Sequence, residues 1–337
     1  MGDFMFAYNQ RFLMYLLIAG LLLVSACSAE SASSDDGTLP EGYPNQTVEV
    51  LVGYGAGGGT DLSARYMVEA LNVEGIVEQS FIVENMTGAD GAIALRELKA
   101  RQGNKYTLEA IPEYGLGLWN NDGDLTIEDF TPIASVATDY QTIAVPGDSP
   151  FETIEDFLAA MKKDPKSIVI SSATSLSGGV GWKWSKIANA IGAPDSPTIV
   201  PMEGENAALT ALLGGDADAT FVVPQLATDH LKKGNIKLLA VMTDERVERF
   251  SDVPTLVEKE VDVTYYRPRG FWMNGTVSDS VREYWEAAFE KMVETDKWNE
   301  YIDQAGLLNE FMGSEEYTNY IKEEGSLYKE YSDTFKK

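Results

Sequence analysis

The residues best suited to chemistry lie in a glycine-rich segment at positions 53–61, directly after the apolar run at 48–52. Five of its nine residues are glycines, so the backbone there can approach a ligand closely. An amphipathic pattern follows, and the free N–H groups at the start of a helix attract anions. The segment therefore predicts a strand-to-helix turn that binds a small anion through main-chain amides, with Thr60 or Asp61 capping the helix. A tight turn without a ligand is the alternative.

Two later segments occupy equivalent places between an expected strand and an expected helix. Residues 171–179 concentrate serine, threonine and glycine, whose hydroxyl and N–H groups suit carboxylate oxygens. Residues 202–207 are a weaker candidate of the same kind. A solvated loop is the alternative for both.

Few other residues point to chemistry. Arg267 and Arg269 flank Pro268, and in so acidic a chain an arginine near a ligand site is a natural carboxylate clamp; a structural ion pair is the alternative. His230 is the single histidine and is expected on the surface of a helix. No Ser-His-Asp, Cys-His or paired metal-ligand pattern is readable, so we expect a protein that is not an enzyme and uses neither a metal nor a cofactor.

The composition excludes one class of partner. The 337 residues carry a formal net charge of −27, from 26 basic and 53 acidic residues. Nucleic acid is an unsuitable partner because phosphate binding needs basic surface. The charge is better explained as a solubilising exterior, and 44% apolar residues provide enough material for one large domain or two ordinary ones.

The N-terminal residues predict export. Residues 1–26 combine Arg11, the apolar segment 12–24 and small residues, which is typical of a signal peptide. The sequence Leu23-Val24-Ser25-Ala26-Cys27 resembles the lipobox of bacterial lipoproteins, which implies a lipid on Cys27. Cys27 is the only cysteine, so an intramolecular disulfide is excluded. Residues 27–42 are expected to be a flexible tether, and the folded part is expected to lie outside the cell membrane, held to its outer face by lipid, or in the periplasm.

From position 43 the pattern alternates between strands and helices, which favours parallel sheets with helical crossovers. Residues 132–146 form an apolar segment too long for an average strand, and we interpret it as a crossover between two lobes. After Thr243 the chain is expected to become helical and to return to the first lobe. We therefore predict a discontinuous lobe 1 from 43–138 and 244–337, and a lobe 2 from 139–243. A ligand would bind where loops of the two lobes face each other.

Several short motifs follow one another along the chain. They are Tyr43-Pro44, Gly57-Gly58-Gly59-Thr60-Asp61, Val83-Glu84-Asn85, Gly88-Ala89-Asp90-Gly91, Asp129-Phe130-Thr131-Pro132-Ile133-Ala134, Ala208-Leu209-Thr210-Ala211-Leu212-Leu213-Gly214-Gly215 with Asp218, Asp252-Val253-Pro254-Thr255 and Arg269-Gly270. In this order they resemble motifs of the substrate-binding receptors of tripartite tricarboxylate transporters, the Bug-type family. The likeness spans about residues 43 to 335.

The resemblance implies an α/β fold of the two-lobed periplasmic-binding-protein type, the type II or Venus-flytrap fold, with two interlobe crossings. It further implies capture of a small organic di- or tricarboxylate and its delivery to integral membrane transporter subunits. We expect the receptor to be a monomer. The expected ligand-binding residues are Ala56, Gly57, Gly58, Gly59, Thr60, Asp61, Ser172, Thr174, Ser177, Gly178, Gly204, Asn206 and Arg269.

Three alternatives stay open at this point. Glu203 and Glu205 stand where the family has a less acidic segment, so a monocarboxylate or a ligand with a cationic group is an alternative to a tricarboxylate. The same fold could present a ligand to a signalling partner. Gly53, Gly55 and Gly58 formally match a dinucleotide fingerprint, but Glu84 lies further away than the usual spacing of about 20 residues, so an exported nucleotide-binding enzyme is the weakest alternative.

Overall fold

The computed structural model describes residues 39–335, apart from 114, 120–122, 174, 175, 177 and 203. The predicted signal peptide and Cys27 lie outside the described residues. The strands are β1 (Val48–Val52), β2 (Phe81–Asn85), β3 (Thr107–Pro112), β4 (Phe130–Tyr140), β5 (Thr142–Pro146), β6 (Val169–Ser172), β7 (Thr198–Pro201), β8 (Ala219–Val222), β9 (Ile236–Val241) and β10 (Tyr266–Asn274). The α-helices are α2 (Gly59–Val73), α3 (Ala92–Ala100), α4 (Leu116–Trp119), α5 (Ile154–Lys163), α6 (Gly179–Ala190), α7 (Glu205–Gly214), α8 (Pro224–Lys232), α9 (Asp279–Val293), α10 (Asp296–Ala305) and α11 (Ser314–Ser332).

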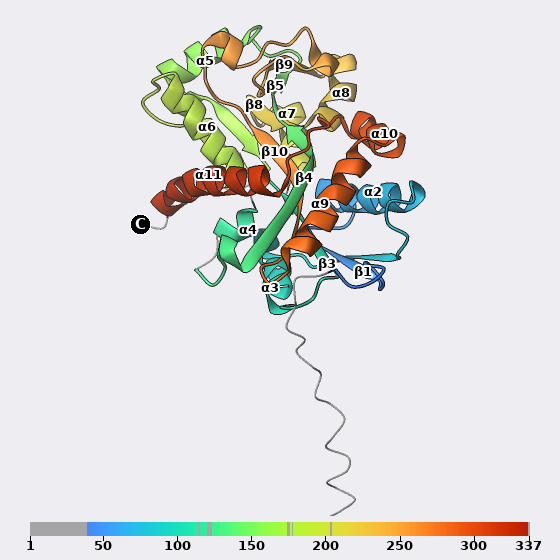
Figure 1. Ribbon diagram of the computed structural model, residues 1–337. Helices are drawn as coiled ribbons and strands as arrows, with labels where there is room; N and C mark the ends of the chain where they lie inside the picture. The colour runs from blue at the N-terminus through green and yellow to red at the C-terminus, as the bar shows by residue number, and fades with distance from the viewer. Residues whose placement is uncertain are drawn as a thin grey trace, which may run out of the picture. The chain divides into compact units, whose positions relative to one another are not determined.

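The first sheet has the strand order β2-β1-β3-β10-β4 and forms lobe 1 (Figure 1). Strands β2, β1 and β3 are parallel, as the alternating pattern predicts. Strand β10 lies antiparallel between β3 and β4. The expectation of a purely helical return after Thr243 is therefore wrong: residues Tyr266–Asn274 form the strand that completes this sheet.

The second sheet has the order β7-β6-β8-β5-β9 and forms lobe 2. Strands β7, β6 and β8 are parallel, and β5 is antiparallel to both of its neighbours. Because β1, β3 and β6 lead into helices at their carboxyl ends, the segments that follow them are well placed for ligand binding in an open α/β sheet.

The apolar segment at 132–146 connects the two sheets. It divides into β4, in the first sheet, and β5, in the second, with only Gln141 between them. The chain returns through residues 242–265, and this stretch adds Leu256, Val261 and Tyr265 to the core of lobe 2. We keep the division of the chain at 138/139 and 243/244 as a proposal.

One helix start carries a capping box, and two others place polar residues just inside the helix. Thr153 and Asp156 form a capping box at the start of α5. Helix α2 begins after Gly58, so Thr60 and Asp61 are helical residues and neither is the cap. Ser314 is likewise the first residue of α11 and not its cap, because its hydroxyl donates to the carbonyl of Pro132, 2.6 Å away.

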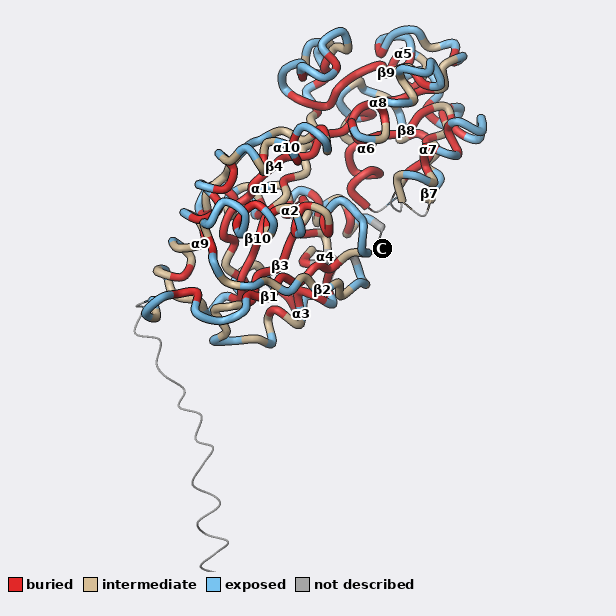
Figure 2. The backbone as a smooth tube through the Cα atoms, turned by 90° about the vertical axis from the view of Figure 1, so that its right-hand side faces the viewer, coloured by how far each residue is buried: buried red, intermediate tan, exposed pale blue. Residues whose placement is uncertain are grey.

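Each lobe has its own apolar core. The strands of both sheets are mostly buried, and exposed segments lie around them (Figure 2). In lobe 1, Phe289 of α9 packs on Phe271 of β10, and Trp285 of α9 packs on Phe289. In lobe 2, the ring of Trp184 stacks on that of Phe221 at 4.5 Å. Aromatic residues of α11 also pack in the interior, since Tyr317 and Tyr328 are fully buried.

One buried carboxyl lies within the lobe 1 core. Glu109 of β3 is 1% exposed, lies in register with Leu51 and Trp272, and its Oε2 has no hydrogen-bond partner among the described residues. Burial raises the pKa of Glu109 well above its ordinary value. The folded protein therefore holds this carboxyl neutral at a pH at which the unfolded chain ionises it.

We expect Glu109→Gln to make the unfolding free energy less dependent on pH. Because the folded pKa of Glu109 lies above the unfolded one, its favourable contribution is complete below the unfolded pKa and is lost as the pH rises through the folded pKa, by up to about 1.4 kcal/mol per pH unit. Urea unfolding from pH 5 to 8 should show the variant gaining stability relative to the wild type as the pH rises. Glu84→Gln, at an exposed position of β2, is the matched control. A constant difference between Glu109→Gln and the wild type would contradict the prediction.

Candidate functional site

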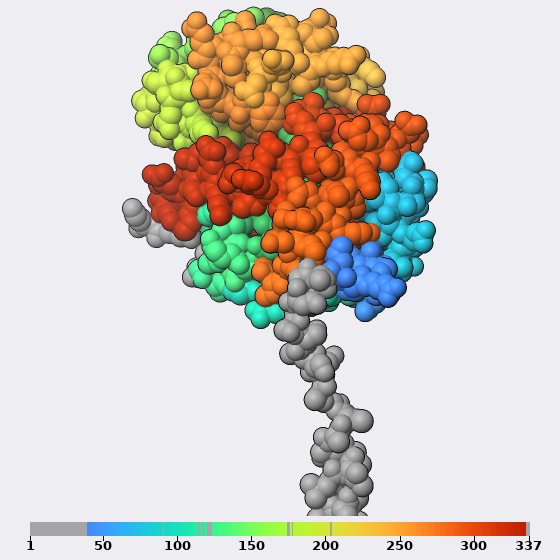
Figure 3. Space-filling model, viewed as in Figure 1, coloured from blue at the N-terminus to red at the C-terminus, as the bar shows by residue number. Residues whose placement is uncertain are grey.

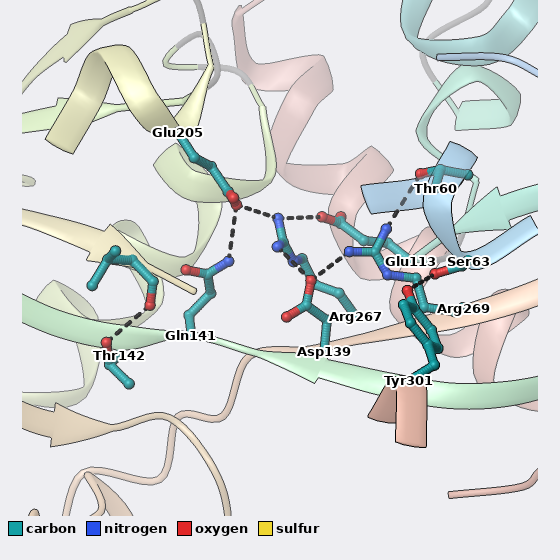
Figure 4. Close-up of polar contacts among 11 residues, drawn as sticks. Thr60, Ser63, Glu113, Asp139, Gln141, Thr142, Glu205, Arg267, Arg269 and Tyr301 are labelled. Atoms are coloured by element: carbon teal, nitrogen blue, oxygen red, sulfur yellow. Dashed lines mark hydrogen bonds and ion pairs between the residues drawn. The ribbon is translucent and has the colours of Figure 1, made fainter. Parts of the chain in front are cut away.

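The candidate site is centred on three charged residues of two neighbouring strands. Asp139 of β4 lies opposite Arg267 of β10, and Arg269 lies two residues further along β10, so its side chain is on the same face. The Oδ2 atom of Asp139 accepts hydrogen bonds from Nη2 of Arg267 at 2.7 Å and Nη2 of Arg269 at 2.5 Å (Figure 4). All three side chains are largely buried. Burial alone would raise the pKa of Asp139, but the two guanidinium groups hold it below its usual range.

This triad joins the two lobes. On the lobe 1 side, Nη1 of Arg269 donates to Oγ1 of Thr60, at the start of α2, over 3.3 Å. On the lobe 2 side, Nη1 of Arg267 lies 2.9 Å from Oε1 of Glu205, the first residue of α7. The contacts therefore run without interruption from the start of α2, after the glycine-rich segment, to the start of α7 (Figure 4).

Two further side chains border the triad. Glu113 directly follows β3, is 7% exposed, and places its Oε1 3.9 Å from Nη1 of Arg267. Burial raises the pKa of Glu113 against the lowering effect of Arg267. Gln141, 2% exposed, donates from Nε2 to Oε1 of Glu205 at 3.4 Å. We call Glu113, Asp139, Glu205, Arg267 and Arg269 the arginine cluster.

Asp61 holds the glycine loop in place. Its carboxylate accepts hydrogen bonds from the amide of Gly57 at 2.8 Å, Nε of Arg65 at 3.0 Å and Nδ2 of Asn85 at 3.0 Å. Burial tends to raise the pKa of Asp61, but Arg65, Gly57 and Asn85 lower it overall. The Asp61 carboxylate therefore bonds to the Gly57 amide, and this bond holds the conformation of the glycine-rich segment.

The next residues combine free amides with a cation. Gly59 and Thr60 are the first two residues of α2, and their N–H groups have no acceptor within the helix. A Cβ atom on Gly59 would lie 2.7 Å from Nη2 of Arg269, so the glycine allows the guanidinium to lie against the helix start. Ala56, Gly57 and Gly58 are exposed beside them. Amides and a guanidinium at one place can bind a carboxylate.

The loops that precede α6 and α7 begin side by side in lobe 2. The carbonyl of buried Ser172 accepts a hydrogen bond from the amide of Met202 at 2.8 Å. Gly178 and Gly204 are the residues preceding α6 and α7, and Gly204 has a φ of 92°, which favours glycine. Asn206 is exposed. Thr174 and Ser177 lie outside the described residues.

A second contact joins the lobes at α6 and α11. Nζ of Lys183 lies 3.1 Å from Oε2 of Glu324, and Lys183 is 3% exposed. The rings of Trp182 and Tyr328 pack edge to face at 5.8 Å. In the space-filling view the atoms of α11 lie directly against those of α6 (Figure 3). Helix α11 therefore contacts lobe 2 as well as the lobe 1 sheet.

Sequence reasoning missed three residues of this site: Glu113, Asp139 and Gln141. The available signal was the polarity of Asp139 and Gln141 within an apolar crossover, since a buried charge needs a partner. Of the predicted residues, the structure brings Gly59, Thr60 and Arg269 together, and it connects them through Asp139 and Arg267 to Glu205, beside Gly204.

A profile of the family described as "Tripartite tricarboxylate transporter family receptor" (TctC) matches residues 64–331. The chain belongs to this receptor family. The family is one of solute-binding receptors of the periplasm, not of enzymes, so the predicted class is confirmed.

Similar proteins agree with this assignment. The receptor is 26% identical over 283 residues to a UPF0065 protein in the gbd 5′ region of Cupriavidus necator, covering 83% of this chain and 85% of the relative. It is 24% identical to BugT of Bordetella pertussis over 72% of this chain and 73% of that protein.

Solved structures confirm the predicted two-lobed fold. A TctC solute-binding protein from Polaromonas superposes with a TM-score of 0.73 at 26% identity, covering 87% of this chain and 99% of that one. MatC from Rhodopseudomonas palustris, solved with bound malate, has the same fold at a TM-score of 0.69 and 19% identity, covering 86% of this chain and 100% of that one. Among the described residues of this receptor, no helix has the length and apolar character needed to cross a membrane.

Proposed function

We propose that this receptor captures a small organic carboxylate between its two lobes and delivers it to the membrane subunits of a tripartite tricarboxylate-type transporter. The observation that carries the proposal is the uninterrupted contact from Thr60 in lobe 1 to Glu205 in lobe 2 through the arginine cluster. Relatives of the same fold were solved with malate and with adipate, both of which are dicarboxylates.

In the proposed mechanism, the ligand's carboxylate binds the amides of Gly59 and Thr60 and the guanidinium of Arg269. The loops before α6 and α7, including Ser172, Gly178 and Gly204, then close onto the same ligand. Closure is a population shift, because the contacts of lobe 2 with the ligand exist only in the closed form. The membrane subunits recognise that form. We further propose that the signal peptide is removed, that Cys27 carries the lipid anchor, and that the receptor acts as a monomer.

A thermal-shift screen of the purified protein against mono-, di- and tricarboxylates tests the proposal. A ligand that binds only the folded form raises the midpoint in proportion to RT ln(1 + [L]/Kd), about 2.7 kcal/mol at a hundredfold excess over Kd. We expect at least one carboxylate to raise the midpoint and nucleotides to leave it unchanged. A shift with nucleotides and none with any carboxylate would overturn the proposal.

We also expect moderate salt to accelerate the binding of an anionic ligand. The net charge of −27 repels anions over long distances, and 0.1 M salt reduces the screening length to about 10 Å. Stopped-flow association rates should therefore rise with potassium chloride, while sucrose of equal osmolality controls for effects not due to ions. Association that slows with salt would show that local cations, not the whole-protein field, control the encounter.

A further inference from the structure

The arginine cluster is electrically asymmetric along its length. At the lobe 1 end, Arg269 contacts one acid among the described residues, Asp139, and the neutral hydroxyl of Thr60. At the lobe 2 end, Arg267 faces three acids: Asp139 at 2.7 Å, Glu205 at 2.9 Å and Glu113 at 3.9 Å. The end beside the glycine loop is therefore relatively cationic, and the end beside α7 is anionic.

Glu205 places a carboxylate of the protein itself on Arg267. Its Oε1 lies on Nη1 of Arg267 and accepts a hydrogen bond from Gln141, and its backbone begins α7, where a negative charge is favoured. The terminal nitrogens of Arg267 are thus engaged by carboxylates of the protein itself. Lys183, a further cation that acts on Glu113, is paired with Glu324 at 3.1 Å. Among the described residues, the cations near this end are therefore already paired, so another carboxylate would meet Glu205 and Glu113 without a free countercharge, which is costly in a largely buried site.

A buried acceptor lies at the same end. Oε1 of Gln141 has no hydrogen-bond partner among the described residues, although the residue is 2% exposed. A buried amide oxygen without a partner is unfavourable, so a hydrogen-bond donor on a ligand would stabilise it. Glu205, with a quarter of its side chain exposed, can accept from the same ligand.

We propose that Glu205 is the specificity-determining residue of this receptor and that it selects ligands with one carboxylate and, at the opposite end, a hydrogen-bond donor, with an ammonium group preferred. The carboxylate binds at Arg269 and the glycine loop, and the donor end binds Glu205 and Gln141. A zwitterion adds no net charge to the cluster, whereas a dicarboxylate adds two negative charges. This inference rests on the proposed function.

The test uses calorimetric titration of the purified protein with three probe series of equal chain length, from three to six carbons: ω-amino acids, linear monocarboxylates and linear dicarboxylates. In the wild type we expect the best ω-amino acid to bind at least tenfold more tightly than the dicarboxylate of the same length. In Glu205→Gln, which removes the charge but keeps the shape, we expect the dicarboxylate to gain at least tenfold and the ω-amino acid to lose affinity.

Controls separate the possible outcomes. Glu152→Gln removes an exposed lobe 2 carboxylate that also pairs with a cation, Lys237, and should leave the preference unchanged. Glu205→Ala is the second variant if Glu205→Gln unfolds. A wild type that binds dicarboxylates as tightly as ω-amino acids, or a preference that neither Glu205 variant alters, would overturn this inference but leave the proposed function intact. If no probe binds any of the proteins, and no carboxylate raises the midpoint in the thermal-shift screen, both are rejected.

Discussion

Replacing Asp139 with asparagine is expected to lower the unfolding free energy by about 3 kcal/mol, the largest stability effect of any single exchange in the arginine cluster. Asp139 is 3% exposed and pairs with the guanidinium groups of both Arg267 and Arg269. Asparagine keeps the size of the side chain but leaves two largely buried cations without their shared counterion. Urea unfolding at neutral pH measures the loss.

A surface ion pair provides the matched control for Asp139→Asn. Arg246 and Glu258 form a bidentate pair at the surface that solvent screens, so Glu258→Gln should cost much less than Asp139→Asn. If Asp139→Asn costs no more than Glu258→Gln, the triad does not stabilise the fold.

The pH dependence gives a second check on the same variant. The folded pKa of Asp139 lies below its unfolded value, so the stabilisation is complete above the unfolded pKa and disappears as the pH falls through the folded pKa. The unfolding free energies of the wild type and Asp139→Asn should therefore differ most at neutral pH. They should converge only in strong acid, below the ordinary aspartate pKa of about 3.9.

Gly181→Ala is expected to weaken carboxylate binding at least tenfold, corresponding to about 1.4 kcal/mol, although Gly181 contacts no predicted ligand group. A Cβ atom at this position of α6 would lie 1.9 Å from the carbonyl oxygen of Leu176, which belongs to the loop before α6. The clash is with backbone atoms and not with the end of a flexible side chain, so only a displacement of the loop can relieve it. The same carbonyl accepts a hydrogen bond from the Tyr331 hydroxyl of α11 at 2.9 Å, which ties the loop to the C-terminal helix.

The control for Gly181→Ala is Gly214→Ala, at the end of α7, where the new Cβ would lie 3.5 Å from its nearest neighbour, Oδ2 of Asp216. Titration calorimetry gives the affinity of each variant, and urea unfolding separates loop displacement from loss of the fold. Tyr331→Phe removes only the hydrogen bond to the loop and should give a smaller reduction. Unchanged affinity in a folded Gly181→Ala would remove the loop before α6 from the proposed site.

Sequence patterns predicted the elements whose chemistry is local. The strand at 48–52, the glycine turn and the helix after it follow from the change in hydrophobic period and from glycine itself. The capping box of Thr153 and Asp156 is likewise a local signal. These features need no knowledge of distant residues, which is why one sequence was enough to find them.

Strand β10 and the arginine cluster depend on distant partners. The segment at 266–274 contains Pro268, Gly270 and two arginines, a composition unfavourable for a central strand. Its irregular pairing with β4, with a register shift at Arg269 and Gly270, accommodates that composition. Asp139 and Glu113 become functional candidates only when β10 brings Arg267 beside them, and no local pattern reports that pairing.

The position of β10 sets the order in which the two lobes can be completed during synthesis. All five strands of the lobe 2 sheet have left the ribosome once Val241 has emerged, whereas β3 and β4 lack their common neighbour until residues 266–274 follow. Lobe 1 therefore depends on contacts between segments more than a hundred residues apart, which slow assembly. Its unpaired strand edges therefore stay open to wrong partners longest, so misassembly threatens most the half that carries the glycine loop.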